Sequence, residues 1–72
     1  MPIVRLQIFS GRPQRMKNEL MKRVSEATAQ VLDIPLEHVQ CIIEEVPKKH
    51  WARGGESFAT RKLEGKGYKH TR

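Results

Sequence analysis

Pro2 is the residue of this sequence with the clearest potential for acid–base chemistry. Removal of the initiator Met1 is favoured when a small residue follows, and it would leave Pro2 with a free secondary amine. An α-amino group titrates near about 7.7–8.0 in model peptides, and apolar surroundings or a neighbouring cation would lower the pKa of this amine. Such a base is suited to moving protons at cellular pH, although proline is also a common second residue with no chemical role.

A second chemical feature is the uneven distribution of charge. Residues 1–47 hold six basic and six acidic residues, whereas residues 48–72 hold eight basic and two acidic residues, so the net charge of +6 belongs to the C-terminal part. Such a field attracts small carboxylates, nucleic-acid backbones and acidic protein surfaces. An alternative function is therefore a non-enzymatic oligomeric module whose basic C-terminal arm binds nucleic acid or an acidic partner. Nucleic acid is not favoured, because the segment from Arg61 to Arg72 carries a single aromatic residue, Tyr68.

Four side chains are of the types that bind metal ions, namely His38, Cys41, His50 and His70. Structural zinc sites use ligand pairs at both ends of a loop, and these residues lack that spacing, so we expect no metal site. Cys41 alternates with apolar residues in a predicted strand and is expected to be a small buried hydrophobe.

The elements that must position Pro2 are predicted from periodicity. Residues 3–9 are rich in β-branched and apolar side chains and end at Ser10-Gly11, which is typical of a strand followed by a breaker. From Gln14 to Leu32 apolar residues recur at helical spacing, and Asp33-Ile34-Pro35 ends the helix. The stripe expected to face the sheet consists of Leu20, Val24, Ala27 and Val31, widened by Met16, Met21, Thr28 and Leu32.

Residues 39–46 are predicted to form a second strand, closed by Pro47-Lys48-Lys49. A strand, a helix and a strand at this spacing favour a parallel pair joined by a right-handed crossover, and therefore an α/β fold made of a single β-α-β unit. Gly54-Gly55 marks a turn, and a short C-terminal hairpin arm is predicted over residues 56–63. The expected domain is residues 1–63, followed by a basic flexible tail over residues 64–72.

The chain is too short for burial alone to make a stable monomer. Its 72 residues and 8.4 kDa make one domain, which removes only about 60% of its unfolded surface from water. With no disulfide or metal to add stability, subunit association is the expected support, and the open edges of a two-stranded sheet favour the same conclusion. No transmembrane run and no signal peptide pattern is seen, so we expect a cytoplasmic protein.

The order of these features resembles the 4-oxalocrotonate tautomerase family. The resemblance covers about residues 2–60 and rests on Met1-Pro2-Ile3-Val4, Gly11-Arg12 before one long helix, a second strand, and the run from His50 to Gly55. It implies a β-α-β subunit that dimerises into a four-stranded sheet, with dimers assembling into homohexamers as trimers of dimers. It also implies that the N-terminal proline moves a proton between oxygen and carbon of a small enol or dienol carboxylate, with no metal or organic cofactor.

The resemblance assigns roles to individual residues. Pro2 matches the general base, and Arg12 matches the arginine that binds a substrate carboxylate, a role suited to a planar guanidinium. Trp51 stands where the family places an aromatic residue, usually phenylalanine, that walls the pocket and lowers the polarity around the proline. Without the resemblance, Arg12 would be a solvated charge and Trp51 ordinary interface packing. Arginines in the related assemblies come from neighbouring chains.

Two positions depart from the family pattern. At Gln40 the best-known members carry a second arginine that polarises the substrate carbonyl and holds its far carboxylate. Losing an oriented electrophilic donor costs on the order of 10²–10³ in rate, so a monocarboxylate such as phenylenolpyruvate is affected less than the dicarboxylate 2-hydroxymuconate. Arg53 replaces a usually apolar residue, and it either restores the missing charge or faces solvent. A relative that hydrates its substrate carries a glutamate at that position, so hydration is disfavoured.

Overall fold

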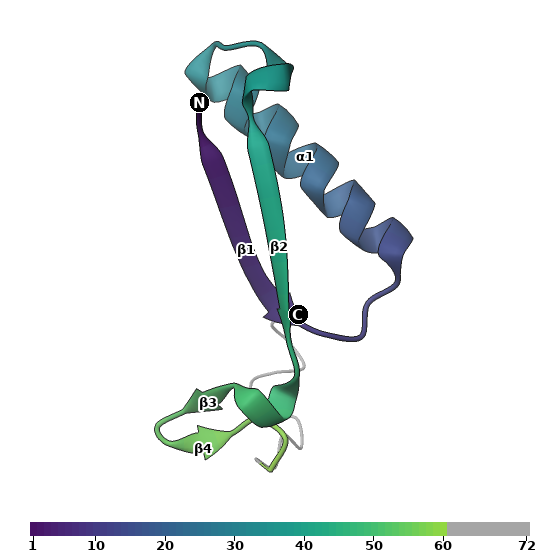
Figure 1. Ribbon diagram of the computed structural model, residues 1–72, viewed down its shortest axis with the longest axis vertical. Helices are drawn as coiled ribbons and strands as arrows, with labels where there is room; N and C mark the ends of the chain where they lie inside the picture. Colours follow the sequence, from purple (N-terminus) through teal and green to yellow (C-terminus); the bar gives the residue numbers. More distant parts are fainter. Residues whose placement is uncertain (61–72) are drawn as a thin grey trace.

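The computed structural model describes residues 1–60 as one β-α-β unit with a hairpin beyond it (Figure 1). The elements follow in the order β1 (Ile3–Phe9), α1 (Gln14–Leu32), a 3-10 turn (Leu36–His38), β2 (Gln40–Val46), a second 3-10 turn (Lys48–His50), β3 (Ala52–Arg53) and β4 (Glu56–Ser57). β2 begins one residue later than predicted, because Val39 still belongs to the end of the first 3-10 turn.

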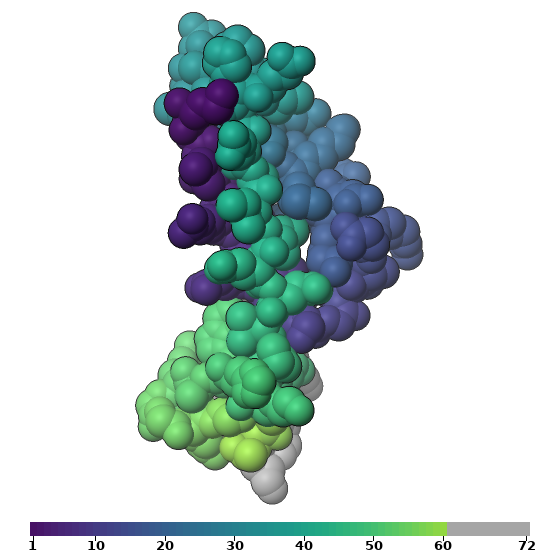
Figure 2. Space-filling model, viewed as in Figure 1, coloured from purple at the N-terminus to yellow at the C-terminus, as the bar shows by residue number. Residues whose placement is uncertain are grey.

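β1 and β2 form a parallel two-stranded sheet, with Ile3 opposite Gln40 and Phe9 opposite Val46. This confirms the predicted α/β fold with parallel strands joined by a helix. α1 crosses one face of the sheet (Figure 1), and alternate residues of β1 are half-buried. Phe9 and, in β2, Cys41, Ile43 and Val46 are half-buried as well. The other residues of the two strands are exposed, with Ile3 53% and Ile42 41% accessible, and Figure 2 shows both strands at the molecular surface.

The stripe that α1 presents to the sheet was predicted only in part. Half of the predicted stripe is half-buried as expected, namely Leu20, Met21, Val24 and Thr28. The other half is exposed, namely Met16, Ala27, Leu32 and Val31, the last of these to 82%. The more buried line of the helix runs through Lys17, Met21, Val24, Ser25, Thr28 and Ala29. Thr28 joins this line because its hydroxyl donates a hydrogen bond to the Val24 carbonyl at 2.8 Å, which satisfies its polarity. The buried face of α1 therefore includes polar residues, and a stripe drawn through apolar residues alone does not coincide with it.

α1 ends at a residue in the left-handed conformation. Asp33 has φ 58° and ψ 52°, and its N–H donates to the Gln30 carbonyl at 3.3 Å. The N–H of Ile34 donates to the Ala29 carbonyl at 3.0 Å, so carbonyls of the last turn find partners. The predicted end of the helix at residue 33 is confirmed.

The hairpin lies earlier in the chain than predicted. β3 and β4 pair antiparallel on either side of Gly54 and Gly55, whose φ angles are +64° and +85°. Positive φ at both central residues is what a type I′ hairpin turn requires. The predicted arm began only after this turn, because a first strand of two residues shows no periodicity. Residues 61–63 of that arm and the predicted tail, residues 64–72, lie outside the described residues.

Residues 1–60 enclose almost no core. Among residues 1–60 only Ala29 and Phe58 are buried, and no large side chain is fully enclosed. The radius of gyration is 15.3 Å, against about 11 Å for a compact chain of this length. The fold therefore leaves apolar surface exposed.

Residues 1–60 contain no helix that is long and apolar enough to cross a bilayer.

We expect Asp33→Val to lower the free energy of unfolding by about 1–2 kcal/mol, because a β-branched side chain disfavours the left-handed conformation. Asp33→Gly is the matched control, since glycine adopts this conformation without a Cβ clash. Urea titration at one fixed protein concentration measures both variants. A valine variant as stable as the glycine variant would contradict the strain assigned to this helix end.

Candidate active site

Pro2 and Gln40 lie together at the start of the parallel sheet. The backbone N–H of Gln40 donates to the Pro2 carbonyl at 3.0 Å, and the Gln40 side-chain amide reaches the sulfur of Met1 at 3.9 Å. Pro2 is half-buried. Its nitrogen becomes basic only after Met1 is removed, because until then it is part of an amide. This end of the sheet thus holds the predicted base and an uncharged hydrogen-bond donor.

A pocket of about 430 Å³ lies at the opposite end of the sheet, between the end of β1 and the hairpin. It brings together three of the predicted site residues, Arg12, Trp51 and Arg53. The rest of its lining is Gln7, Ile8, Phe9, Ala52 and Phe58. A volume of this size accommodates a small organic acid. Two guanidinium groups and several aromatic rings give it both anion-binding and apolar character.

Three aromatic rings form one wall of this pocket. The ring centroids of Phe9 and Trp51 are 4.7 Å apart, and those of Phe9 and Phe58 are 5.4 Å apart, both with edge-to-face geometry. Phe58 is buried, and its N–H donates to the Trp51 carbonyl at 2.8 Å. The ammonium of Lys48 lies 5.4 Å from the Phe9 ring centroid, a favourable cation–π distance. These contacts hold the hairpin against the end of β1.

Sequence reasoning missed Phe9 and Phe58 as pocket residues. Phe9 was assigned only to the first strand, and Phe58 only to a hairpin arm. One available signal was that Phe9 comes just before the Gly11-Arg12 pair, at the end of a strand that already carries the predicted base at its start.

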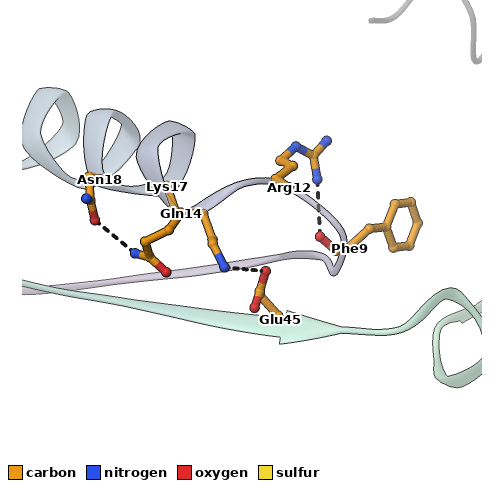
Figure 3. Close-up of polar contacts among 6 residues, drawn as sticks. All are labelled: Phe9, Arg12, Gln14, Lys17, Asn18 and Glu45. Carbon is orange, nitrogen blue, oxygen red and sulfur yellow. Dashed lines mark hydrogen bonds and ion pairs between the residues drawn. The ribbon is translucent and has the colours of Figure 1, made fainter.

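Arg12 is positioned by the loop between β1 and α1 (Figure 3). One of its guanidinium nitrogens donates to the Phe9 carbonyl at 3.2 Å, which keeps the side chain near the aromatic wall. The start of α1 is in turn tied to the end of β2 by the ion pair between Lys17 and Glu45, at 2.9 Å. Lys17 is the less exposed partner, with 15% of its side chain accessible, so screening by water is limited. The helix start and the Arg12 loop are therefore fixed to the sheet.

The five predicted site residues fall into two groups that do not meet within one chain. The seven residues of β1 separate them, and seven residues in a strand span roughly 23 Å at about 3.3 Å each. Pro2 with Gln40 lies at one end of this span, and Arg12, Trp51 and Arg53 lie at the other. A substrate held by Arg12 is therefore out of reach of the proline of the same subunit.

Within residues 1–60 no three histidine, cysteine, aspartate or glutamate side chains gather to hold a metal ion. Cys41 is a free, half-buried cysteine in β2. The basic arm of the alternative binding function lies mostly at residues 61–72, outside the described part of the chain.

Comparisons with known proteins agree with the resemblance seen in the sequence. The family described as "Tautomerase enzyme" matches residues 2–61. The 2-hydroxymuconate tautomerase of Pseudomonas sp. strain CF600 is 50% identical over 56 residues, which are 78% of this chain and 89% of that protein. A 2-hydroxymuconate tautomerase of Stutzerimonas stutzeri is 47% identical over 57 residues, which are 79% of this chain and 90% of that protein.

A solved structure has the same arrangement of elements. The heterohexameric 4-oxalocrotonate tautomerase of Chloroflexus aurantiacus superposes with a TM-score of 0.81 at 40% identity, covering 86% of this chain and 100% of that chain. The family match extends over most of the chain, and the predicted resemblance is confirmed. The chain therefore belongs to the tautomerase family, as a 4-oxalocrotonate tautomerase-like isomerase.

Proposed function

We propose that this chain is a keto–enol tautomerase in which the amine of Pro2, freed by removal of Met1, is the general acid and base. Its substrate is a small enol or dienol carboxylate such as 2-hydroxymuconate or phenylenolpyruvate. Family membership and the 2-hydroxymuconate tautomerases at up to 50% identity support the reaction class. The observation that supports the residue assignment is that Pro2 and the pocket with Arg12 lie at opposite ends of β1. Two chains with antiparallel β1 strands would therefore bring the Pro2 of one chain to the Arg12 of the other.

The proposed reaction conserves every atom of the substrate. The neutral Pro2 amine takes the proton of the 2-hydroxyl group, and the electron pair of that O–H bond becomes the second bond of the new carbonyl group. The displaced C=C pair takes up a proton at carbon from the same nitrogen, so the amine ends neutral as it began. Arg12 holds the substrate carboxylate by two parallel hydrogen bonds, which keeps the reacting carbon near the amine.

A second copy of the chain supplies the missing half of each site. β2 pairs with one side of β1 within residues 1–60, and antiparallel pairing of two β1 strands about a two-fold axis gives a four-stranded sheet. The Pro2 end of each β1 then adjoins the end of the other β1 that carries Phe9 and Arg12. Each dimer holds two complete sites, and we propose a homohexamer of three such dimers, or failing that a dimer, as the assembly.

The remaining site residues complete the proposed chemistry. Trp51 forms an apolar wall that lowers the polarity around the amine and favours its neutral form. Arg53, which lines the same pocket as Arg12, supplies positive charge near the substrate oxygen. Gln40 offers a hydrogen bond beside the proline. The cytoplasmic location expected from the sequence stays a prediction.

Pro2→Ala should lower kcat/KM by about 10²-fold, the low end of the usual contribution of a positioned acid–base group, because the alanine variant keeps a basic primary α-amine but loses the proline ring that positions it. Ketonisation of phenylenolpyruvate and 2-hydroxymuconate measures it, on protein whose intact mass shows that Met1 is absent. A preparation that retains Met1 is the matched control, because its Pro2 nitrogen is a non-basic amide. Full activity in either protein would contradict the role of the amine.

Mixed assemblies test whether the site is shared between chains. Pro2→Ala and Arg12→Ala subunits should each be nearly inactive alone, yet equal mixtures that are unfolded and refolded together should regain about a quarter of wild-type activity, since random pairing restores that share of sites. Each variant refolded by itself is the control. Mixtures as inactive as their components would show that Pro2 and Arg12 of different chains do not cooperate.

Arg53→Ala should lower kcat/KM by about 10²-fold on both substrates, because both carry the oxygen that the guanidinium polarises. Arg53→Lys should recover part of the loss, since it keeps the charge without the planar fork. Arg23→Ala, on the exposed side of α1, controls for removal of one positive charge. Kinetic constants untouched by Arg53→Ala would make this residue a solvated charge.

A further inference from the structure

The loop that carries Arg12 is attached on both sides to two consecutive residues of β2. On the β1 side, the backbone N–H of Ser10 donates to the Val46 carbonyl at 3.1 Å. On the helix side, the ammonium of Lys17 lies 2.9 Å from a carboxylate oxygen of Glu45. Figure 3 shows Arg12 on the loop between the end of β1 and the part of α1 that carries Lys17. The loop is therefore a short bridge with both ends tied to neighbouring points of the sheet.

Arg12 stands between a residue that can turn and a residue that cannot. Gly11 has φ 120°, a backbone conformation that residues with a side chain rarely adopt. Pro13 has φ −67°, which its ring fixes, and its carbonyl accepts the N–H groups of Met16 and Lys17 at 3.1 Å and 3.3 Å. Pro13 thus moves with the first turn of α1. Any displacement of the helix start is passed to Arg12 and taken up at the glycine.

The ion pair between Lys17 and Glu45 is better shielded than a second ion pair of the same helix. Its side chains are 15% and 33% accessible at a separation of 2.9 Å. Those of Lys22 and Glu26 are 65% and 49% accessible at 3.7 Å, and both belong to α1. Water and salt weaken an exposed pair, whereas loss of one partner of a shielded pair leaves the other charge uncompensated. The Lys17 pair joins α1 to β2, so its loss would release the helix start.

We propose that Lys17 and Glu45 are positioning residues for the substrate carboxylate, and that their ion pair sets the direction in which Arg12 presents its guanidinium. This inference rests on the proposed tautomerase function and adds two residues to it that lie outside the described lining of the Arg12 pocket. A bidentate contact requires the guanidinium and the carboxylate to be aligned. A loop that rotates at Gly11 therefore weakens the grip on a substrate that the Pro2 amine of the adjoining chain must reach.

The test measures ketonisation of phenylenolpyruvate on the assembled protein lacking Met1. Glu45→Gln and Lys17→Met should each raise KM by about fivefold or more with a much smaller change in kcat, because the contact that they weaken holds substrate and transition state alike. The double variant should be no worse than either single variant, since both remove the same ion pair. Lys17→Arg keeps the charge and should retain most of the wild-type KM. Glu45→Asp, which also keeps its charge, replaces Glu45→Gln if that variant fails to assemble and should give a smaller rise.

Two comparisons separate positioning from a general loss of stability. Glu26→Gln breaks the exposed ion pair with Lys22 by the same chemical change and should leave KM unchanged. In an Arg12→Ala background, Glu45→Gln should have no further effect on kcat/KM, because the group that it positions is gone. Cinnamate, which is phenylenolpyruvate without its 2-hydroxyl group, is an inert probe of the same contact. Its Kd, measured by calorimetric titration, should rise in parallel with KM.

The outcomes distinguish this inference from the proposed function. A wild-type rate in Pro2→Ala would overturn the tautomerase mechanism, and the cinnamate titration would then decide the positioning role without turnover. Activity that depends on Pro2, with KM and the cinnamate Kd both unchanged in Glu45→Gln and Lys17→Met, would overturn the inference alone. So would an equal loss from Glu45→Gln with and without Arg12, because the ion pair would then support the fold in general.

Discussion

A two-stranded sheet covered by one helix cannot enclose a core, and the rest of this structure depends on that limit. Ala29 and Phe58 are the buried residues of the described chain, while Ile3 and Ile42 lie open on the strands. Full burial of a side chain of this size is worth about 1.5–3 kcal/mol, and each of these two, roughly half exposed, forfeits about half of that. Since a domain is stable by only about 5–15 kcal/mol, covering a few such side chains with another copy decides whether the chain folds at all.

The same limit links assembly to catalysis. Within residues 1–60, β1 has one edge without a strand partner, and it also separates Pro2 from Arg12. A two-fold axis through paired β1 strands reverses the direction of one strand relative to the other, so the ends that are remote within a chain become neighbours between chains. In the proposed dimer, one pairing event would both stabilise the fold and form two sites. A subunit that fails to assemble would lack activity without any damage to its own residues.

The sequence predicted the regular elements well and the site only in part. β1 and α1 have the predicted bounds because alternation from Ile3 to Phe9 and the helical spacing that ends at Asp33 are strong local signals. The buried face of α1 was misjudged at Ala27 and Val31, because facing depends on a narrow sheet and not on the helix alone. Phe9 was not recognised as a pocket residue, since it meets Trp51 and Phe58 only through folding of segments more than 40 residues apart.

The hairpin is the element in which pocket chemistry can change with the least effect on the fold. Trp51 and Phe58 pack against Phe9 at the end of β1, whereas the β-α-β unit has its own hydrogen-bonded register. Arg53 sits in a two-residue strand beside a glycine turn, outside the parallel sheet. Gln40, by contrast, is fixed in register opposite Ile3. In the proposed site, the uncharged Gln40 on the parallel sheet and the charged Arg53 on the hairpin would place the positive charge on the hairpin.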